Sequence, residues 1–132
     1  MPLVTFYFQI HQPLRLHPSR DKFFWEEKNR DIFLKVADKC YLPAIAMFTL
    51  SMSGTFLEQA ELYNYQVISE LQKLFEAGRE KGQVECLDET YYHSLASLFA
   101  DPEKREFRDQ VSMHRDKLGV RFGLSPTSFR NT

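Results

Sequence analysis

A histidine and a glutamine, His11 and Gln12, follow the apolar run FYFQI near the start of the chain. Both side chains donate and accept hydrogen bonds, so the pair suits neutral hydroxyl groups such as those of a sugar. The ordinary alternative is a polar cap at a strand end, satisfied by backbone groups. The residue types favour neither interpretation over the other, because one histidine does not identify a function.

A second polar group, Glu85 and His93, brackets a short hydrophobic stretch and the loop that follows it. Burying a carboxylate is costly unless it is hydrogen-bonded, so we expect Glu85 on an open face or in a polar site. Asp88 and Glu89 lie between the two, and their commoner interpretation is as solvated loop charges. A metal site of His11, Glu85 and His93 is the weaker hypothesis, because the sequence has no HExxH motif or His/Asp cluster.

Aromatic side chains offer a further kind of contact. Tyr91, Tyr92 and Trp25 present flat faces that suit a pyranose ring, although such rings more often belong to a core. The two remaining histidines, His17 and His114, are interpreted as structural, the first in a loop and the second on an apolar helical face.

Charge and cysteine content exclude several classes of function. Lys and Arg (17) nearly balance Asp and Glu (18), so no basic field for nucleic acid or an anionic membrane surface is expected. Cys40 and Cys86 are too few for a disulfide framework and are expected to be buried free thiols. The sequence has no signal-peptide pattern and no apolar run of about 18 to 20 residues, so we expect a cytoplasmic protein. No cofactor is expected.

The elements that must position these residues alternate between strands and helices. Strand patterns occupy residues 4–10, 46–53 and 83–87, with a fourth beginning near Ser128. Helical patterns occupy residues 27–41 and 56–77 and begin again at Asp101, with Pro43, Gly119 and Gly123 as expected helix ends. This alternation predicts an α/β fold with a parallel sheet or barrel.

In such a fold the carboxyl ends of the strands meet at one rim, where ligands bind. The residues expected at that rim are His11, Ser53, Gly54, residues 85–93 and residues 130–132. The candidate polar groups are therefore expected to come together although they are far apart in the sequence.

Four segments, in order, resemble glycoside hydrolase family 57 and in particular its α-amylase-type members. The family's first signature, centred on HQP, is similar to FYFQIHQPLRL, and its second strand and turn are similar to FTLSMSGTFLEQ. The second signature is similar to GQVECLDETYYHSLASLF, and the approach to the third is similar to FGLSPTSFRNT. Together these segments cover nearly the whole chain.

The resemblance implies the N-terminal part of an incomplete, seven-stranded β/α barrel that acts on α-1,4-glucan or maltooligosaccharides with retention of configuration. It implies that His11, with Gln12, contacts the sugar at the cleavage point, that Glu85 orients the sugar, and that His93 shapes the same pocket. Retention needs two carboxylates, one as nucleophile and one as acid/base. In the family pattern the nucleophile follows directly after a stretch like FRNT, which here ends at Thr132. The nucleophile is therefore expected just after Thr132, and residues 1–132 alone are expected to be inactive.

Two alternatives remain beside a hydrolase or 4-α-glucanotransferase. One is a noncatalytic glucan-binding or regulatory protein, and the less favoured one is a metal-dependent polysaccharide deacetylase. The chain also departs from the family pattern near Ala44, where YLPAIAMFTLS passes almost directly from helix to strand. This short connection indicates a deletion relative to the family.

Overall fold

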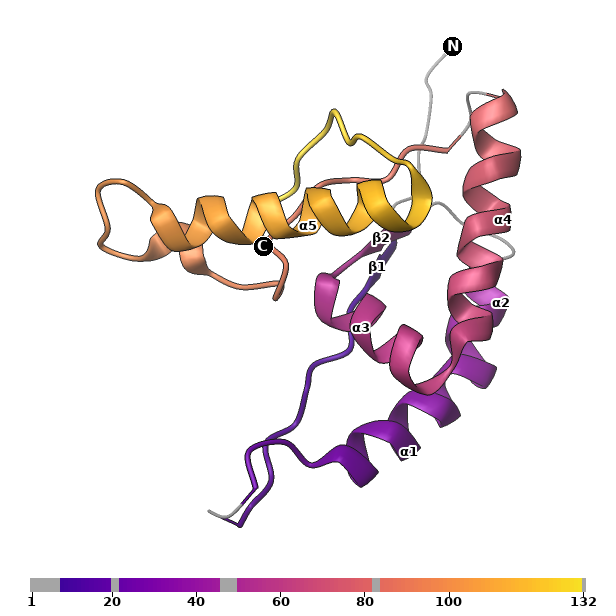
Figure 1. Cartoon of the computed structure of the whole chain (residues 1–132), viewed down its shortest axis with the longest axis horizontal. Coiled ribbons are helices and arrows are strands. Elements are labelled where there is room, and N and C mark those ends of the chain that lie inside the picture. Colours follow the sequence, from indigo (N-terminus) through magenta and orange to yellow (C-terminus); the bar gives the residue numbers. More distant parts are fainter. Residues whose placement is uncertain (1–7, 20–21, 46–49, 82–83, 132) are drawn as a thin grey trace.

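The computed structural model of the chain describes residues 8–19, 22–45, 50–81 and 84–131. Its centre is a two-stranded parallel sheet with helices around it (Figure 1). Strand β1 (Phe8–Ile10) pairs with strand β2 (Leu50–Met52), with Ile10 opposite Met52. The helices are α1 (Glu26–Val36), a π-helical turn (Ala37–Tyr41), α2 (Leu42–Ile45), α3 (Gly54–Tyr63), α4 (Tyr65–Lys81), a 3-10 turn (Ala96–Leu98) and α5 (Arg105–Phe122).

The mixed α/β class and the parallel direction of the first two strands are confirmed. The described residues do not form seven strands, so the barrel remains a prediction for a longer protein. The predicted strand residues 4–7 and 46–49, which include part of the short connection after Ala44, lie outside the described residues.

The strand predicted over residues 83–87 is wrong for its described part, because residues 84–87 have no regular secondary structure. Backbone pairing begins one residue later, in an isolated parallel bridge between Asp88 and Phe129. The side chain of Val84 fills the space over Gly78, so this segment packs against helix α4. The fourth predicted strand is reduced to the bridge at Phe129.

The single helix predicted over residues 56–77 is two helices. Helix α3 begins at Gly54 because the Ser53 hydroxyl accepts a hydrogen bond from the Phe56 amide (3.4 Å), a typical N-cap. It ends at Asn64, whose side-chain oxygen accepts from the Gln66 amide (3.2 Å). Such a local bond competes with the helical ladder, so the chain breaks there and starts again as α4.

Pro43 does not end the first helix as predicted, because it lies inside α2. The π-helical turn comes first, and the Leu42 amide bonds to the Ala37 carbonyl across its wider repeat. Pro43 has no N–H, so it needs no acceptor in this first turn. Cys40, expected to be buried, is exposed on the same turn, whereas Cys86 is buried as predicted.

Helix α5 begins at Arg105, after the predicted start at Asp101. The Asp101 carboxylate instead accepts from the amides of Glu103 (3.1 Å) and Arg105 (3.0 Å) and caps the helix from outside. Gly119 lies within the helix and does not end it. Gly123 does, with a φ of 62° that favours glycine.

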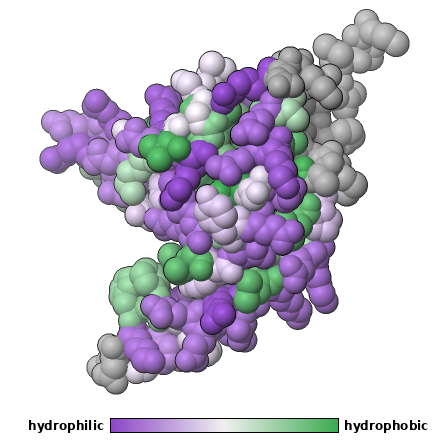
Figure 2. Space-filling view, turned by 45° about the vertical axis from the view of Figure 1, so that its right-hand side comes forward, coloured by the Kyte–Doolittle hydropathy of each residue, from purple (hydrophilic) through white to green (hydrophobic). Residues whose placement is uncertain are grey.

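The hydrophobic core lies between the sheet and the helices. Helix α4 contacts α3 and α5, and the rings of Phe75 and Phe122 meet at 5.2 Å where α4 and α5 pack together. The face shown in Figure 2 is largely hydrophilic with separate hydrophobic patches. The buried side chains of the core include Ile10, Phe33, Met52, Phe56, Leu57, Ile68, Leu71 and Leu118.

Replacing Gly54 by alanine is expected to destabilise the fold. A Cβ atom there would lie 2.4 Å from ring carbons of Tyr91, so the ring must move. We expect a loss of about 1–3 kcal/mol in the free energy of unfolding, as is usual for overpacking. Urea unfolding of Gly54→Ala measures it.

The matched control is Gly119→Ala, where the nearest atom to the new Cβ is the Leu124 carbonyl oxygen at 3.8 Å. This position is inside a helix, so we expect no loss or a gain of up to about 1 kcal/mol. Equal urea midpoints for both variants would show that Tyr91 does not pack on Gly54.

Candidate functional site

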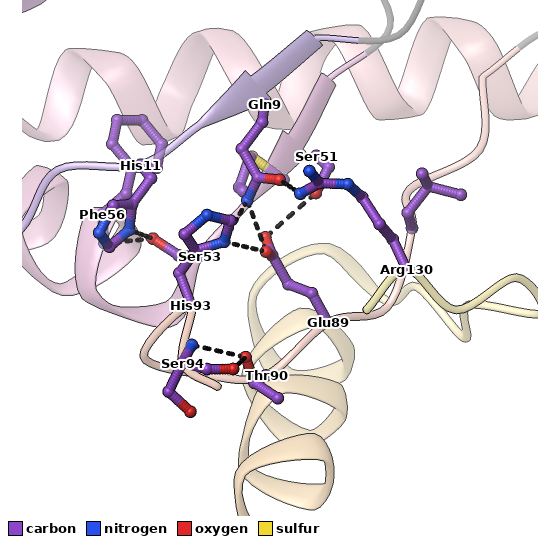
Figure 3. A network of polar contacts seen from close by, with 12 residues as sticks. Gln9, His11, Ser51, Ser53, Phe56, Glu89, Thr90, His93, Ser94 and Arg130 are labelled. Carbon is purple, nitrogen blue, oxygen red and sulfur yellow. Dashed lines mark hydrogen bonds and ion pairs between the residues drawn. The ribbon is translucent and has the colours of Figure 1, made fainter. Parts of the chain in front are cut away.

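The candidate site lies at the carboxyl ends of β1 and β2. His11 directly follows β1 and Ser53 directly follows β2, and the Ser53 amide donates to the Ile10 carbonyl (3.1 Å). This backbone bond places the His11 Nδ1 atom 2.7 Å from the Ser53 hydroxyl (Figure 3). The hydroxyl that caps α3 therefore also holds the first candidate histidine.

His93 comes from the loop after Asp88 and stacks on His11. The two ring centroids lie 4.7 Å apart with an interplanar angle of 30°. His93 has a φ of 53°, and its amide donates to the Thr90 carbonyl (2.9 Å). The left-handed conformation is uncommon for residues other than glycine, and it closes the turn that brings the imidazole back to the rim.

A buried carboxylate, Glu89, lies beside the His93 ring. Its side chain is 1% exposed and accepts hydrogen bonds from Gln9 of β1 (2.5 Å) and Ser51 of β2 (3.0 Å). The Oε2 atom also lies 3.1 Å from Nδ1 of His93 (Figure 3). The interpretation of Glu89 as a solvated loop charge is therefore wrong.

Arg130 joins the end of the described chain to this network. Its guanidinium donates to the side-chain oxygen of Gln9, whose amide nitrogen faces Glu89. The Arg130 amide donates to the Asp88 carbonyl (2.8 Å), so side chain and backbone fix the segment together. The network thus connects four stretches of chain at the rim.

Asp88 is buried as well, on the side of helix α5. Its carboxylate lies 3.0 Å from Nδ1 of His114 and accepts from the guanidinium of Arg115. His114 is fully buried, and its Nε2 atom lies 2.8 Å from the Met52 carbonyl oxygen at the end of β2. Asp88 is therefore not a solvated charge either, and His114 has the structural place predicted for it.

Gln12 faces the protein interior with 6% of its surface exposed. Its side-chain oxygen accepts from the Tyr41 hydroxyl (2.7 Å), and its carbonyl accepts from Gln59 (2.6 Å). Burial raises the pKa of Tyr41 to about 12, so this hydroxyl keeps its proton and remains a donor. The contacts resemble the polar-cap alternative, and the sugar contact predicted for Gln12 remains a prediction.

Glu85 lies on an open face, which is one of the two environments expected for it. Its carboxylate accepts from the Thr127 hydroxyl (2.7 Å). Hydrogen bonds from Thr127 and Ser128 lower the pKa of Glu85, so the group is ionised at neutral pH. The structure thus separates Glu85, which is exposed, from Glu89, which is buried beside His93.

The aromatic residues considered for sugar stacking have different environments. Tyr91 is buried, and its hydroxyl donates to Glu58 (2.8 Å), so it belongs to the core. Tyr92 is exposed and meets the Tyr91 ring edge-on at 5.1 Å. Trp25 packs edge-on against His17 at 5.6 Å, in a segment that projects from the body of the molecule (Figure 1).

The electrostatics of the site favour a neutral imidazole at His11. Burial lowers the pKa of His11, nearby His93 lowers it further, and the charge of Glu89 opposes the shift. A neutral imidazole hydrogen-bonds well to hydroxyl groups but does not attract anions. Within the described residues no group of three His, Cys, Asp or Glu side chains is placed to hold a metal ion.

Comparison with known proteins identifies the family. The sequence pattern described as glycosyl hydrolase family 57 matches residues 5–132. The chain belongs to glycosyl hydrolase family 57. The resemblance recognised in four segments of the sequence is thereby confirmed.

One relative of this family 57 chain is a protein of Methanocaldococcus jannaschii named "Putative alpha-amylase", which is 36% identical over 149 residues. The match covers 98% of this chain but 31% of the relative, so the chain spans about a third of the relative's length. Because the matched stretch is longer than the 132 residues of this chain, the relative has additional residues within it. No solved structure was found to match the chain.

In the described parts of the family 57 chain, no helix has the length and apolar character needed to cross a bilayer.

Sequence reasoning missed Glu89, whose partners Gln9 and Ser51 lie 80 and 38 residues away. A usable signal was the position of Glu89, four residues before His93 and at a strand end.

The pH dependence of stability tests the environment of His11. In the unfolded chain the ordinary pKa of 6.5 applies, whereas burial lowers the folded-state pKa. The unfolded state therefore binds more protons, and stability is full above 6.5 and is lost as the pH falls through the folded-state pKa. As the pH falls from 6.5 through the folded-state pKa, we expect the difference in unfolding free energy between the wild type and His11→Gln to shrink.

Urea midpoints of both proteins from about pH 8 to about pH 5 measure this difference. Parallel profiles for the wild type and His11→Gln would contradict a buried, neutral His11.

Proposed function

We propose that this chain supplies the sugar-contacting side of an active site in a longer, retaining glycoside hydrolase. The substrate class is α-1,4-glucan or maltooligosaccharide, and the reaction is of the α-amylase or 4-α-glucanotransferase type. The observation that carries the proposal is the stacked pair of His11 and His93 at the carboxyl ends of parallel strands. A neutral imidazole at His11 suits the hydroxyl groups of a sugar.

Gln12 and Glu85 complete the proposed sugar-contacting set. Gln12 follows His11 directly and fixes the end of the strand through Tyr41. Glu85 keeps an exposed, ionised carboxylate that can accept hydrogen bonds from sugar hydroxyls. In the proposed arrangement His11 contacts the sugar at the cleavage point, His93 shapes the pocket, and Glu85 orients the substrate.

The two catalytic carboxylates of a retaining mechanism are assigned to residues beyond this chain. A nucleophile must reach the anomeric carbon, but both oxygens of the buried Glu89 are already hydrogen-bonded. The anchoring of Arg130 beside Gln9 supports a nucleophile just after Thr132, because extended residues advance only about 3.3 Å each. The acid/base would come from still further along.

For the full-length protein we propose the incomplete seven-stranded β/α barrel with parallel strands, with residues 1–132 as its N-terminal part. The β1–β2 pair and the bridge between Asp88 and Phe129 are both parallel, which supports this arrangement. We also propose a cytoplasmic location, a mechanism without cofactors, and no nucleic-acid partner, in line with the balanced charge.

A second candidate is a noncatalytic glucan-binding or regulatory protein. The engagement of both Glu89 oxygens fits this candidate as well as the first, because it leaves this carboxylate unavailable as a nucleophile. The two candidates differ in turnover by the full-length protein and agree in glucan binding.

Replacing a proposed sugar contact should impair turnover in the full-length protein. We expect His11→Ala to lower kcat/KM for maltooligosaccharides by about 100-fold, because a misplaced substrate reacts far more slowly. Glu85→Ala should lower it in the same direction. Oligosaccharide product analysis measures both.

The control is His17→Ala, which removes a histidine that contacts Trp25 and lies in the projecting segment. We expect its turnover to match the wild type. Unchanged turnover in His11→Ala and Glu85→Ala would refute the assignment of the site.

The chain of residues 1–132 alone should release no product from maltooligosaccharides, because it lacks the proposed nucleophile and acid/base. Mass spectrometry of the sugar mixture, compared with a protein-free blank and with the full-length protein, checks this expectation. Product formation above the blank by the short chain would mean that its own carboxylates are catalytic.

A further inference from the structure

The orientation of the Gln9 side chain is fixed by its neighbours. The guanidinium of Arg130 carries only donors, so it must face the side-chain oxygen of Gln9. The Gln9 amide nitrogen then points to the other side, where it lies 2.5 Å from Glu89 and 3.0 Å from Nδ1 of His93. Gln9 therefore presents hydrogen atoms, and not an acceptor, to both groups.

The contact between Glu89 and His93 locates a proton on the imidazole. Oε2 of Glu89 lies 3.1 Å from Nδ1 of His93, which is hydrogen-bond distance. A carboxylate only accepts, so an unprotonated Nδ1 would place two lone pairs against each other. The bond from Ser51 to Oε1 holds the other oxygen, so the carboxylate cannot rotate away.

The opposite tautomer would need Gln9 to donate to a lone pair on Nδ1. That arrangement gains a neutral hydrogen bond from Gln9, which the tautomer with the proton on Nδ1 gives up, but it leaves a buried carboxylate oxygen facing the same lone pair. Hydrogen bonds to an ionised group are roughly twice as strong as neutral ones, so the proton on Nδ1 is favoured. The 1% exposure of Glu89 adds to this preference, because water cannot replace a lost donor.

The remaining ring nitrogen of His93 is available to a ligand. The side chain of His93 is 22% exposed, whereas the Glu89 side chain on its Nδ1 side is buried. The hydrogen bonds that the described residues make with this ring all end on Nδ1. Because Nε2 of His93 is not among the buried polar side-chain atoms that lack a partner, this nitrogen reaches solvent.

We infer that Glu89 is a positioning residue that keeps the proton of His93 on Nδ1 and thereby leaves Nε2 as a hydrogen-bond acceptor for a sugar hydroxyl. The ligand, a sugar hydroxyl, rests on the proposed function. The position of the proton rests only on the geometry of Glu89 and His93. Glu89 would not touch the sugar itself. It would act through His93, and the stack would carry its effect to His11.

The test is the tautomer of His93 in the 15N-labelled full-length protein without sugar, near pH 8. Long-range proton–nitrogen correlation spectra distinguish protonated from unprotonated ring nitrogens, and the spectrum of His93→Gln identifies the signals of His93. We expect a protonated Nδ1 and an unprotonated Nε2. A protonated Nε2, in a neutral or a charged ring, would overturn the inference.

Two variants separate positioning from general stability. In Glu89→Leu the amide of Gln9 is left to donate to Nδ1, so we expect the proton to move to Nε2. Ser51→Ala removes a different donor from the same carboxylate and should keep the wild-type tautomer. A shared tautomer in both variants would overturn the role of Glu89, and if Glu89→Leu fails to fold, the wild-type spectrum still decides.

Turnover of maltooligosaccharides by the same proteins connects the tautomer with function. We expect Glu89→Leu to lower kcat/KM by about 100-fold, as for a misplaced substrate contact. An inactive wild type with the expected tautomer would refute the proposed function and leave the role of Glu89 on His93 intact. An active wild type with a protonated Nε2 would refute the positioning role alone.

Discussion

The burial of one carboxylate, Glu89, constrains the whole rim of the molecule. A buried charge is tolerated only when it is well hydrogen-bonded, and its donors here come from separate parts of the chain. Gln9 belongs to β1, Ser51 belongs to β2, and His93 lies in the same loop as Glu89. The carboxylate is therefore satisfied only when both strands and the loop are in place together.

The neighbouring carboxylate, Asp88, completes this arrangement on the other side. Successive side chains of an extended segment point in opposite directions, so Asp88 turns toward α5 while Glu89 turns toward the strand ends. Asp88 meets His114 and Arg115, and His114 also reaches the carbonyl at the end of β2. Two adjacent acidic residues thus fix the loop both to a helix and to the sheet, and this loop carries His93 of the stacked pair.

The sequence was sufficient to predict the parallel α/β class and the meeting of His11 with the loop that contains His93. It was not sufficient to predict that Glu89 is buried, because the apolar residues around Glu85 resemble a strand while pairing starts at Asp88. The partners of Glu89 lie up to 80 residues away, and no local pattern contains them. The helix break at Asn64, in contrast, has a local cause, because the Asn64 side chain accepts a hydrogen bond from the nearby Gln66 amide.

The parallel pairing of β1 with β2 has a consequence for the order of folding. Phe8 and Leu50 are partners across a long stretch of chain, and closing such a loop costs entropy before any strand bond forms. Helices α3 and α4 are sequence neighbours and contact each other directly, so we expect them to form first. Pulse-labelling hydrogen exchange should then protect amides of α4 before the Ser53 amide, and the reverse order would exclude this pathway. The rim that carries His11 and His93 would be the last part of the chain to mature.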